Sequence, residues 1–249
     1  MTIKVAVLGA KGRMGQTTVE AINATSDLEL VAAIDLGDSL DLLLSSGAQV
    51  VVDFTHPDSV MPNVEFAINH GINVVVGTTG FNSEKLATIS GWLGTNPGVG
   101  ALIAPNFGLG AVLMMQFAAQ ASKYFESVEI IELHHPNKAD APSGTATRTA
   151  ELITEARNSV AKEVMPDATS SGLQGARGAK VGDVPIHSVR LRGLVAHQEV
   201  ILGDIGETLT IRHDSIDRTG FMPGVLLGIR KVVATPGLTF GLEHFLDLK

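Results

Sequence analysis

The feature of this sequence that most constrains its fold is an apolar run that ends in three evenly spaced glycines. The run from Ile3 to Leu8 is followed by Gly9, Gly12 and Gly15, which lead into a helix-like segment. A short apolar run closed by glycines predicts a strand, a tight turn and a helix. This order of elements is typical of the start of an α/β fold.

The same alternation of apolar runs and helix-like segments continues through the first hundred residues. We therefore expect an α/β fold with a Rossmann-like, doubly wound parallel sheet. The carboxyl ends of its strands are where ligands of such sheets bind. Strands are predicted at 3–8, 28–34, 50–54, 72–76 and 99–104, and helices at 14–23, 60–69 and 83–93.

The pattern changes after a long predicted helix at 109–124, because strands then follow one another. This predicts a second α+β domain built on a mixed or antiparallel sheet. An apolar helix at 225–233 is too short to form a domain and is expected to return to the first sheet. We therefore expect residues 1–107 and 217–249 to form one domain and 108–216 the other. The second domain's expected strands are 128–131, 186–192, 199–202 and 208–213, and 158–183 is expected to be a long surface loop.

The glycine turn also predicts a dinucleotide site. Glycines let a pyrophosphate approach the backbone amides at a helix N-terminus, although Lys11 occupies the position of the usual second glycine. Asp35 ends the second predicted strand and can accept hydrogen bonds from the adenosine ribose. Its charge opposes a 2′-phosphate, whereas Lys11 and Arg13 can receive one. We therefore predict that both NADH and NADPH are used; the alternative is a glycine turn that only joins a strand to a helix.

A second concentration of chemistry lies between Glu132 and Ala146. His134, His135 and Lys138 can donate protons or bind an anion, and two prolines predict a loop. Ser143 is a favourable N-cap, so the amides of Gly144 and Thr145 in the following helical turn would form a site for a carboxylate or phosphate. Neighbouring histidines of a strand face opposite ways, so at most one would enter a cleft.

A metal site is the alternative interpretation of the same stretch. Its ligands would be His134, His135 and Asp140. We predict no metal, because adjacent histidines rarely share one ion and the usual ligand spacings are missing.

Composition limits the classes of partner. The formal net charge is −8, which disfavours nucleic acid, and an anionic ligand would need a local basic site. There is no apolar run long enough to span a membrane, so no membrane association is expected. The sequence has no cysteine and hence no disulfide. A cytoplasmic location is expected, because we find no secretion signal.

Four stretches resemble the 4-hydroxy-tetrahydrodipicolinate reductase family, also called dihydrodipicolinate reductase. They are Gly9-Ala10-Lys11-Gly12-Arg13-Met14-Gly15, Gly77-Thr78-Thr79-Gly80, Ala104-Pro105-Asn106-Phe107 and the stretch that contains His-His-Pro-Asn-Lys-Ala-Asp-Ala-Pro-Ser-Gly-Thr. The last is the most specific. The resemblance extends over nearly the whole chain and includes Arg192 to His197 and Arg218 to Phe221.

The resemblance implies a cytoplasmic homotetramer that reduces a small cyclic dicarboxylate in the diaminopimelate route to lysine. The first domain would bind the dinucleotide, and the second would bind substrate and form the assembly through its sheet. His134 and Lys138 match the family's catalytic pair, and His135, Gly144 and Thr145 match its substrate-binding positions. The positions that match its cofactor contacts are Gly9, Ala10, Lys11, Gly12, Arg13, Met14, Asp35, Gly77, Thr78, Thr79, Ala104, Pro105, Asn106 and Phe107.

The residue chemistry is consistent with such a reaction, and two other functions stay open. Hydride transfer to a conjugated ring must be completed by a proton, for which Lys138 is the favoured donor and His134 the polariser or relay. Leu36 follows Asp35 where some family members have arginine, which weakens the expectation of a 2′-phosphate contact. The alternatives are a dehydrogenase for aspartate or an aldehyde acid, and a nucleotide-sensing regulator without turnover.

Overall fold

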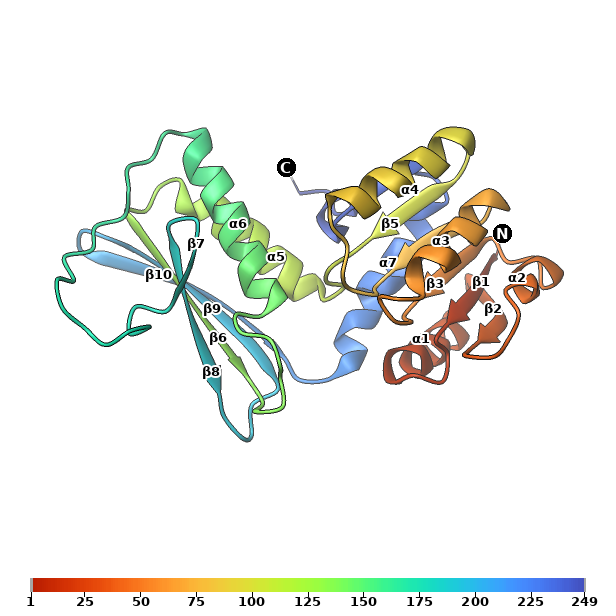
Figure 1. The fold of residues 1–249 in the computed structure, drawn as a ribbon, viewed down its shortest axis with the longest axis horizontal. Coiled ribbons are helices and arrows are strands. Elements are labelled where there is room, and N and C mark those ends of the chain that lie inside the picture. The colour runs from red at the N-terminus through yellow and green to blue at the C-terminus, as the bar shows by residue number, and fades with distance from the viewer. Residues whose placement is uncertain (1, 249) are drawn as a thin grey trace. The chain divides into compact units, whose positions relative to one another are not determined.

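The computed structural model describes residues 2–248, and its contacts divide the chain into two units (Figure 1). Unit 1 consists of Met1–Leu109 and Arg218–Lys249, and unit 2 consists of Gly110–Asp217. The middle of the chain is thus inserted into a unit that both ends of the chain build.

The core of unit 1 is a parallel sheet of six strands in the order β11-β5-β4-β3-β1-β2. The chain starts in the middle of the sheet, runs to one edge and then crosses to the other. This confirms the predicted doubly wound parallel sheet. The strands are β1 (Ile3–Leu8), β2 (Leu28–Ile34), β3 (Val50–Asp53), β4 (Asn73–Val76), β5 (Gly100–Ile103) and β11 (Gly237–Phe240).

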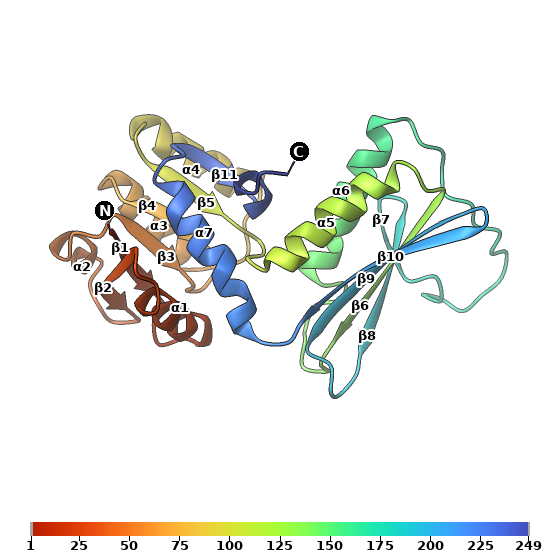
Figure 2. The ribbon, with the colours of Figure 1, turned by 180° about the vertical axis from the view of Figure 1, so that it is seen from behind.

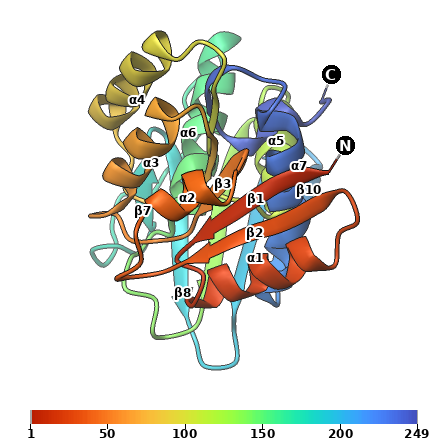
Figure 3. The same cartoon turned by 90° about the vertical axis from the view of Figure 1, so that its right-hand side faces the viewer.

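Helices cover both faces of this sheet, which is why its central strands are mostly apolar (Figure 3). Ala6 and Leu8 of β1 belong to the cluster beneath α3 and α4, and the equally buried Val5 and Val7 alternate with them. On the other face, α1 packs against β1 and β2, and α7 packs against β4 and β5. The helices are α1 (Arg13–Asn23), α2 (Asp41–Ser45), α3 (Val60–Asn69), α4 (Ser83–Thr95) and α7 (Met222–Val232).

Besides two short helical turns near the C-terminus, one helix and one strand of unit 1 were not predicted. The short helix α2 has a single turn, and β11 has only four residues, all partly buried at the sheet's edge. Both are too short for hydrophobic periodicity to reveal them. The strand β11 pairs in parallel with β5 from Gly237↔Gly100 to Phe240↔Ile103, so the chain's last strand completes the sheet that its first strand begins.

Unit 2 contains a mixed sheet of five strands in the order β10-β9-β6-β8-β7. The β6–β8 pair is parallel and the other pairs are antiparallel, so the sheet is the mixed one of the two predicted arrangements. The strand β7 lies inside the segment predicted to be loop, and β6 extends to His134, further than expected. The strands are β6 (Ser127–His134), β7 (Ala179–Val181), β8 (Val184–Arg190), β9 (Ala196–Asp204) and β10 (Glu207–Ser215).

The helices α5 (Leu109–Ser122) and α6 (Gly144–Ser159) lie on the same side of the second sheet (Figure 2). Residues of β6 therefore alternate: Val128, Ile130 and Glu132 are buried, whereas Glu129 and Ile131 are only partly buried. Among residues 2–248, no helix covers the opposite face of this sheet. Short helical turns at Arg218–Phe221 and Leu242–Phe245 complete the elements. No helix of the described chain has both the length and the apolar character needed to cross a membrane.

The helix α7 packs so closely against the rest of unit 1 that the contact depends on a glycine. A Cβ atom at Gly224 would lie 2.0 Å from the carbonyl oxygen of Phe107, far inside contact distance. This oxygen belongs to backbone, which cannot rotate away as a side chain can. Glycine at position 224 therefore lets α7 cover the sheet.

We predict that Gly224→Ala lowers the free energy of unfolding of unit 1 by about 1–3 kcal/mol, the usual cost of overpacking. Urea unfolding followed by the fluorescence of Trp92, the single tryptophan and a residue of α4, measures the change. Gly94→Ala is the matched control, because Gly94 is also helical and a Cβ there meets nothing within 4 Å. It should stabilise the unit or leave it unchanged. Equal effects of both substitutions would contradict this account of α7.

Candidate functional site

The turn after β1 is built so tightly that only glycine fits two of its positions. Gly9 has φ +75°, and a Cβ there would lie 2.6 Å from the carbonyl oxygen of Phe54. A Cβ on Gly15 would lie 2.0 Å from the carbonyl oxygen of Gly9. The backbone of the turn is thus in direct contact with the first turn of α1 and the end of β3, and no side chain obstructs its outer surface at Gly9 or Gly12.

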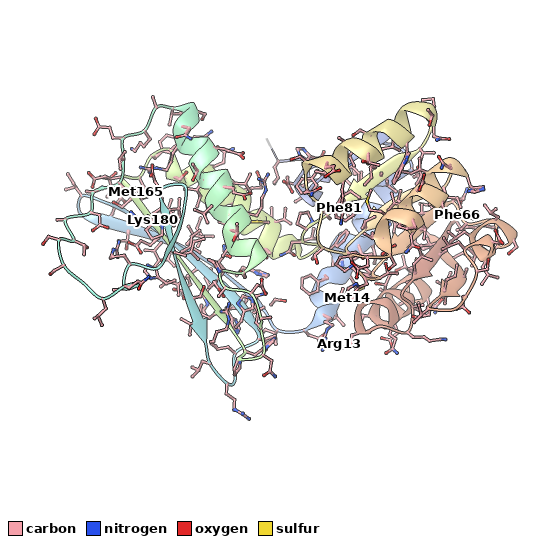
Figure 4. The ribbon with its side chains drawn as sticks, viewed as in Figure 1. Arg13, Met14, Phe66, Phe81, Met165 and Lys180 are labelled. Carbon is pink, nitrogen blue, oxygen red and sulfur yellow. The ribbon has the colours of Figure 1, made fainter. Side chains whose placement is uncertain are left out.

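The start of α1 fits a phosphate group. Gly12 is the N-cap and provides no side-chain hydrogen bond, so the amides of the first turn have no cap acceptor. Lys11 and Arg13 are exposed here, and Figure 4 shows the side chains of Arg13 and Met14 at this end of the helix. Amides, the helix dipole and two cations together favour an anion.

Asp35, at the end of β2, is tied to the glycine turn. Its Oδ2 accepts a hydrogen bond from the Lys11 amide at 2.6 Å, and its Oδ1 accepts one from the Leu36 amide at 2.8 Å. These bonds, that from Lys11 first, lower the pKa of Asp35 below its usual range. A carboxylate has about four acceptor positions, so Asp35 retains capacity for further donors. The Leu36 side chain is fully exposed.

A buried carboxylate, which the sequence analysis did not single out, shapes the next loops along the sheet edge. Asp53 ends β3 with no exposed surface. Its Oδ1 accepts from the hydroxyls of Thr55 at 2.7 Å and Thr78 at 2.8 Å, and its Oδ2 accepts from Asn63 Nδ2 at 2.8 Å. The only signal in the sequence was an acid directly after three valines. Asp53 therefore holds Thr78, one of the predicted cofactor residues, in a buried position.

Phe54 brings the two remaining cofactor stretches into one neighbourhood. A Cβ on Gly77 would lie 2.1 Å from the Phe54 ring, and the ring meets Phe107 edge to face with centroids 5.9 Å apart. Ala104 joins this edge through a hydrogen bond from its amide to the Val76 carbonyl. Thr79 and Pro105 are exposed, and Asn106 is partly exposed.

The candidate catalytic residues of unit 2 begin at the end of β6. His134 is the last residue of that strand, whereas the sequence predicted that it belongs to a loop. Its Nδ1 lies 2.5 Å from Oε2 of Glu132, which is completely buried. Burial lowers the pKa of the His134 ring below its usual range, although the Glu132 carboxylate acts in the opposite direction. The charges of Lys138 and Arg190 contribute to the lowering.

Lys138 lies in the loop that follows. Its Nζ is paired with Oδ1 of Asp140 at 2.7 Å, and its side chain is only 22% exposed. The pair lowers the pKa of Asp140. The neighbouring His135 is exposed, and its carbonyl accepts the Lys138 amide at 3.3 Å. The charge of Lys138 is one of the smaller causes that lower the pKa of the His134 ring.

The helix α6 begins where the sequence predicted. Ser143 is the N-cap, and its Oγ accepts the Ala146 amide at 3.2 Å. The Ser143 amide donates to Oε1 of Glu132, so the helix start and His134 depend on the same carboxylate. A Cβ at Gly144 would meet nothing within 4 Å, which leaves the backbone at the first helical residue open to approach. Thr145 follows it in the first turn.

Arg190 was not predicted from the sequence either, and Glu132 was named there only as the start of a stretch. Arg190 ends β8, and its guanidinium makes two hydrogen bonds of 2.8 Å to the two oxygens of Glu132. The signal that could have revealed it is the buried acid itself, because a buried carboxylate needs a cation. Nothing local in the sequence indicates that β8 lies beside β6. Residues 2–248 contain no cluster of three or more potential metal ligands.

Two family models match the chain and together cover almost all of it. The model for the N-terminus of dihydrodipicolinate reductase matches residues 3–107, and the model for its C-terminus matches residues 110–246. The 4-hydroxy-tetrahydrodipicolinate reductase of Streptomyces coelicolor is 63% identical over 99% of this chain and 98% of its own. That of Nocardia farcinica is 63% identical over the full length of both chains.

Solved structures agree with this relationship. A dipicolinate-bound dihydrodipicolinate reductase from Paenisporosarcina sp. TG-14 has a TM-score of 0.88 and 38% identity, covering 99% of this chain and 100% of its own. An amine dehydrogenase from Mycobacterium smegmatis has a TM-score of 0.64 at 13% identity, covering 96% and 95%, and shares the fold alone. The full-length matches in sequence and structure show that this chain belongs to the 4-hydroxy-tetrahydrodipicolinate reductase family.

Proposed function

We propose that this chain reduces 4-hydroxy-tetrahydrodipicolinate to tetrahydrodipicolinate with NAD(P)H, in the diaminopimelate route to lysine. The observation that carries this proposal is the arrangement around Glu132. One buried carboxylate contacts both His134 and the amide of Ser143, which caps a helix start open to an anion. A proton-transfer group beside an anion site suits a dicarboxylate that must gain a proton during reduction.

Residues of unit 1 would hold the nicotinamide nucleotide. The pyrophosphate fits the glycine turn and the start of α1, where Gly9, Ala10, Gly12 and Met14 surround uncapped amides. The stretches Gly77–Thr79 and Ala104–Phe107 would contact the rest of the nucleotide from the same edge of the sheet. When bound, the reduced nicotinamide supplies the hydride from its C4 atom.

Both NADH and NADPH are proposed as cofactors. Asp35 would accept hydrogen bonds from the adenosine ribose, which favours NADH, because the carboxylate repels a 2′-phosphate. Lys11 and Arg13 are exposed at the same turn and would neutralise that phosphate. The fully exposed Leu36 offers the phosphate no partner, so these two cations would provide most of the NADPH contact.

The substrate's carboxylate would bind at the start of α6. The amides of Gly144 and Thr145 would donate to it, and His135 and Lys138 would supply positive charge or hydrogen bonds nearby. Asp140 is the present partner of Lys138, so the substrate's carboxylate would compete with a protein carboxylate for the same ammonium group. This arrangement favours a strongly anionic substrate over a neutral one.

Lys138 is proposed as the proton donor, with His134 as the polariser or relay. Hydride addition displaces electron density toward the ring nitrogen and the conjugated system, and a proton must complete the reaction. The ammonium group of Lys138 can give that proton. His134 can orient or pass it at Nε2, because its Nδ1 is already bound to Glu132.

The chain would form two domains with separate roles. Residues 1–107 and 217–249 would form the dinucleotide-binding domain, and 108–216 the domain for substrate binding and assembly. We propose a homotetramer formed through the sheet face of unit 2 that no helix covers among the described residues. The reaction class and the family support a cytoplasmic location.

We predict that Lys138→Ala lowers kcat by about 10²–10⁴-fold, the usual contribution of a positioned proton donor. Oxidation of NADH and NADPH by freshly prepared 4-hydroxy-tetrahydrodipicolinate, followed in the near ultraviolet, measures it. Lys180→Ala is the control, because Lys180 is an exposed lysine on β7 of the same unit (Figure 4). Unchanged turnover in Lys138→Ala would leave the reaction in place and remove Lys138 as donor. No oxidation by the wild type would favour a nucleotide-sensing regulator.

We predict that Arg13→Ala weakens NADPH binding about tenfold, because a hydrogen bond to a charged group contributes about 1.5–3 kcal/mol before solvent screening. NADH binding should change less than about threefold, since NADH has no 2′-phosphate. Calorimetric titration of each cofactor gives both constants, and Lys231→Ala, at an exposed position near the end of α7, is the control. A preference of the wild type for one cofactor above about a thousandfold, or about 4 kcal/mol, would contradict dual use.

A further inference from the structure

The most unusual side chain of unit 2 is a carboxylate with no access to water. Glu132 lies on β6 two residues before His134, and its side chain has no exposed surface. By the alternation of β6 it lies on the same buried face of the strand as Val128 and Ile130. A carboxylate in such surroundings is costly unless charged and hydrogen-bonding groups satisfy it.

Protein groups from three separate segments satisfy Glu132. His134 Nδ1, at the end of β6, lies 2.5 Å from Oε2. Arg190, at the end of β8, donates to both oxygens at 2.8 Å. The amide of Ser143, which caps α6, donates to Oε1 at 3.2 Å. Burial by itself would raise the pKa of Glu132, but hydrogen bonds from Arg190, Ser188 and His134 outweigh it and hold the pKa below the usual range.

We propose that Glu132 is a positioning residue for the reaction, because its carboxylate fixes the ring of His134 and the anion-binding start of α6 in one arrangement, with Arg190 as its counter-ion. This inference rests on the proposed function, in which His134 takes part in proton transfer. Glu132 itself, being fully buried, would not touch the substrate.

The bond to Glu132 determines which nitrogen of His134 is available. An ionised carboxylate only accepts hydrogen bonds, so Nδ1 must carry the proton that lies between Nδ1 and Oε2. In the neutral ring, Nε2 is then the unprotonated nitrogen and can accept a proton. When Nε2 is protonated, the negative charge of Glu132 balances the charge of the ring.

Arg190 extends the arrangement to the proposed proton donor. Its Nη2 donates to the carbonyl oxygen of Asp140 at 2.7 Å in addition to Glu132. The Asp140 carboxylate in turn binds Nζ of Lys138 at 2.7 Å. The ion pair between Glu132 and Arg190 therefore connects both residues that the mechanism uses, His134 directly and Lys138 through the loop that carries it.

A second glutamate on β6, Glu129, serves as a matched control for Glu132. Glu129 also binds a histidine and an arginine, because its carboxylate lies 2.5 Å from His187 Nε2 and pairs with Arg177. It lies on the opposite face of β6, however, and is 31% exposed. Glu129 is thus a glutamate with the same kinds of partners on the same strand, but without a bond to His134 or to the start of α6.

The test compares Glu132→Gln with Glu129→Gln in the full-length protein. A glutamine at position 132 can still accept the Ser143 amide, but it can no longer accept from His134 and Arg190 as a carboxylate does. We expect kcat for the reduction to fall about 10–100-fold, the usual effect of losing a residue that orients a functional histidine. KM for the substrate should change less than about threefold, and Glu129→Gln should retain kcat within about twofold of the wild type.

A second measurement does not depend on turnover. Nitrogen NMR of ¹⁵N-histidine-labelled protein, with the signals of His134 identified by their loss in His134→Gln, reports which ring nitrogen is protonated. In the wild type, the neutral ring of His134 should carry its proton on Nδ1. In Glu132→Gln, the ring should titrate at lower pH than in the wild type, because the balancing negative charge has been removed.

Each outcome is decisive. The inference is overturned if Glu132→Gln retains kcat within about twofold of the wild type. It is also overturned if Glu129→Gln loses as much kcat as Glu132→Gln while both variants keep the oligomeric mass of the wild type. If Glu132→Gln does not fold, Glu132→Asp keeps the charge but cannot reach His134 and Ser143 together, and wild-type kcat in that variant would also overturn it. If the wild type oxidises neither cofactor, the proposed function fails. The NMR measurement still decides whether Glu132 determines which ring nitrogen of His134 carries the proton.

Discussion

A carboxylate that is buried at the end of a strand must be satisfied by protein groups, and this constraint organises both halves of the molecule. In unit 2, Glu132 has no exposed surface and is held by Arg190, His134 and the amide of Ser143. Removing any one partner would leave buried polar groups unpaired, which costs more than a hydrogen bond contributes on the surface. The positions of the strand end, the loop and the helix start are therefore coupled.

In unit 1 a buried carboxylate is likewise satisfied by protein groups, which here are neutral. Asp53 ends β3 and accepts from the hydroxyls of Thr55 and Thr78 and from Asn63. It fixes the loop after β4 as Glu132 fixes the loop after β6. Ligand sites of parallel sheets lie where strands end, and the loops there need rigid support to bind with defined geometry. A buried acid with several partners gives such support without filling the space that a ligand requires.

The sequence predicted local structure well and long-range partners poorly. The bounds of β1, β2 and α3 agree with the prediction, and so does Ser143 as the cap of α6, because periodicity and capping are local properties. The edge strand β11 was missed because it forms only where β5 offers its free edge. The candidate site residues were predicted partly from local chemistry and partly from a family resemblance. Arg190 was not predicted, since 58 residues separate it from Glu132 and only the parallel β6–β8 pairing joins them.

The ion pair between Lys138 and Asp140 bears on how a negatively charged protein would bind an anionic substrate. The protein carries a net charge of −8, so its overall field opposes an anionic substrate. In the structure, the ammonium group of Lys138 is held 2.7 Å from a carboxylate. A substrate carboxylate that displaced Asp140 would replace one ion pair of Lys138 by another. Binding strength would then come from the helix start at Gly144, whose amides are not neutralised by an acid in the first turn of α6. The cap of that helix is in turn fixed by Glu132.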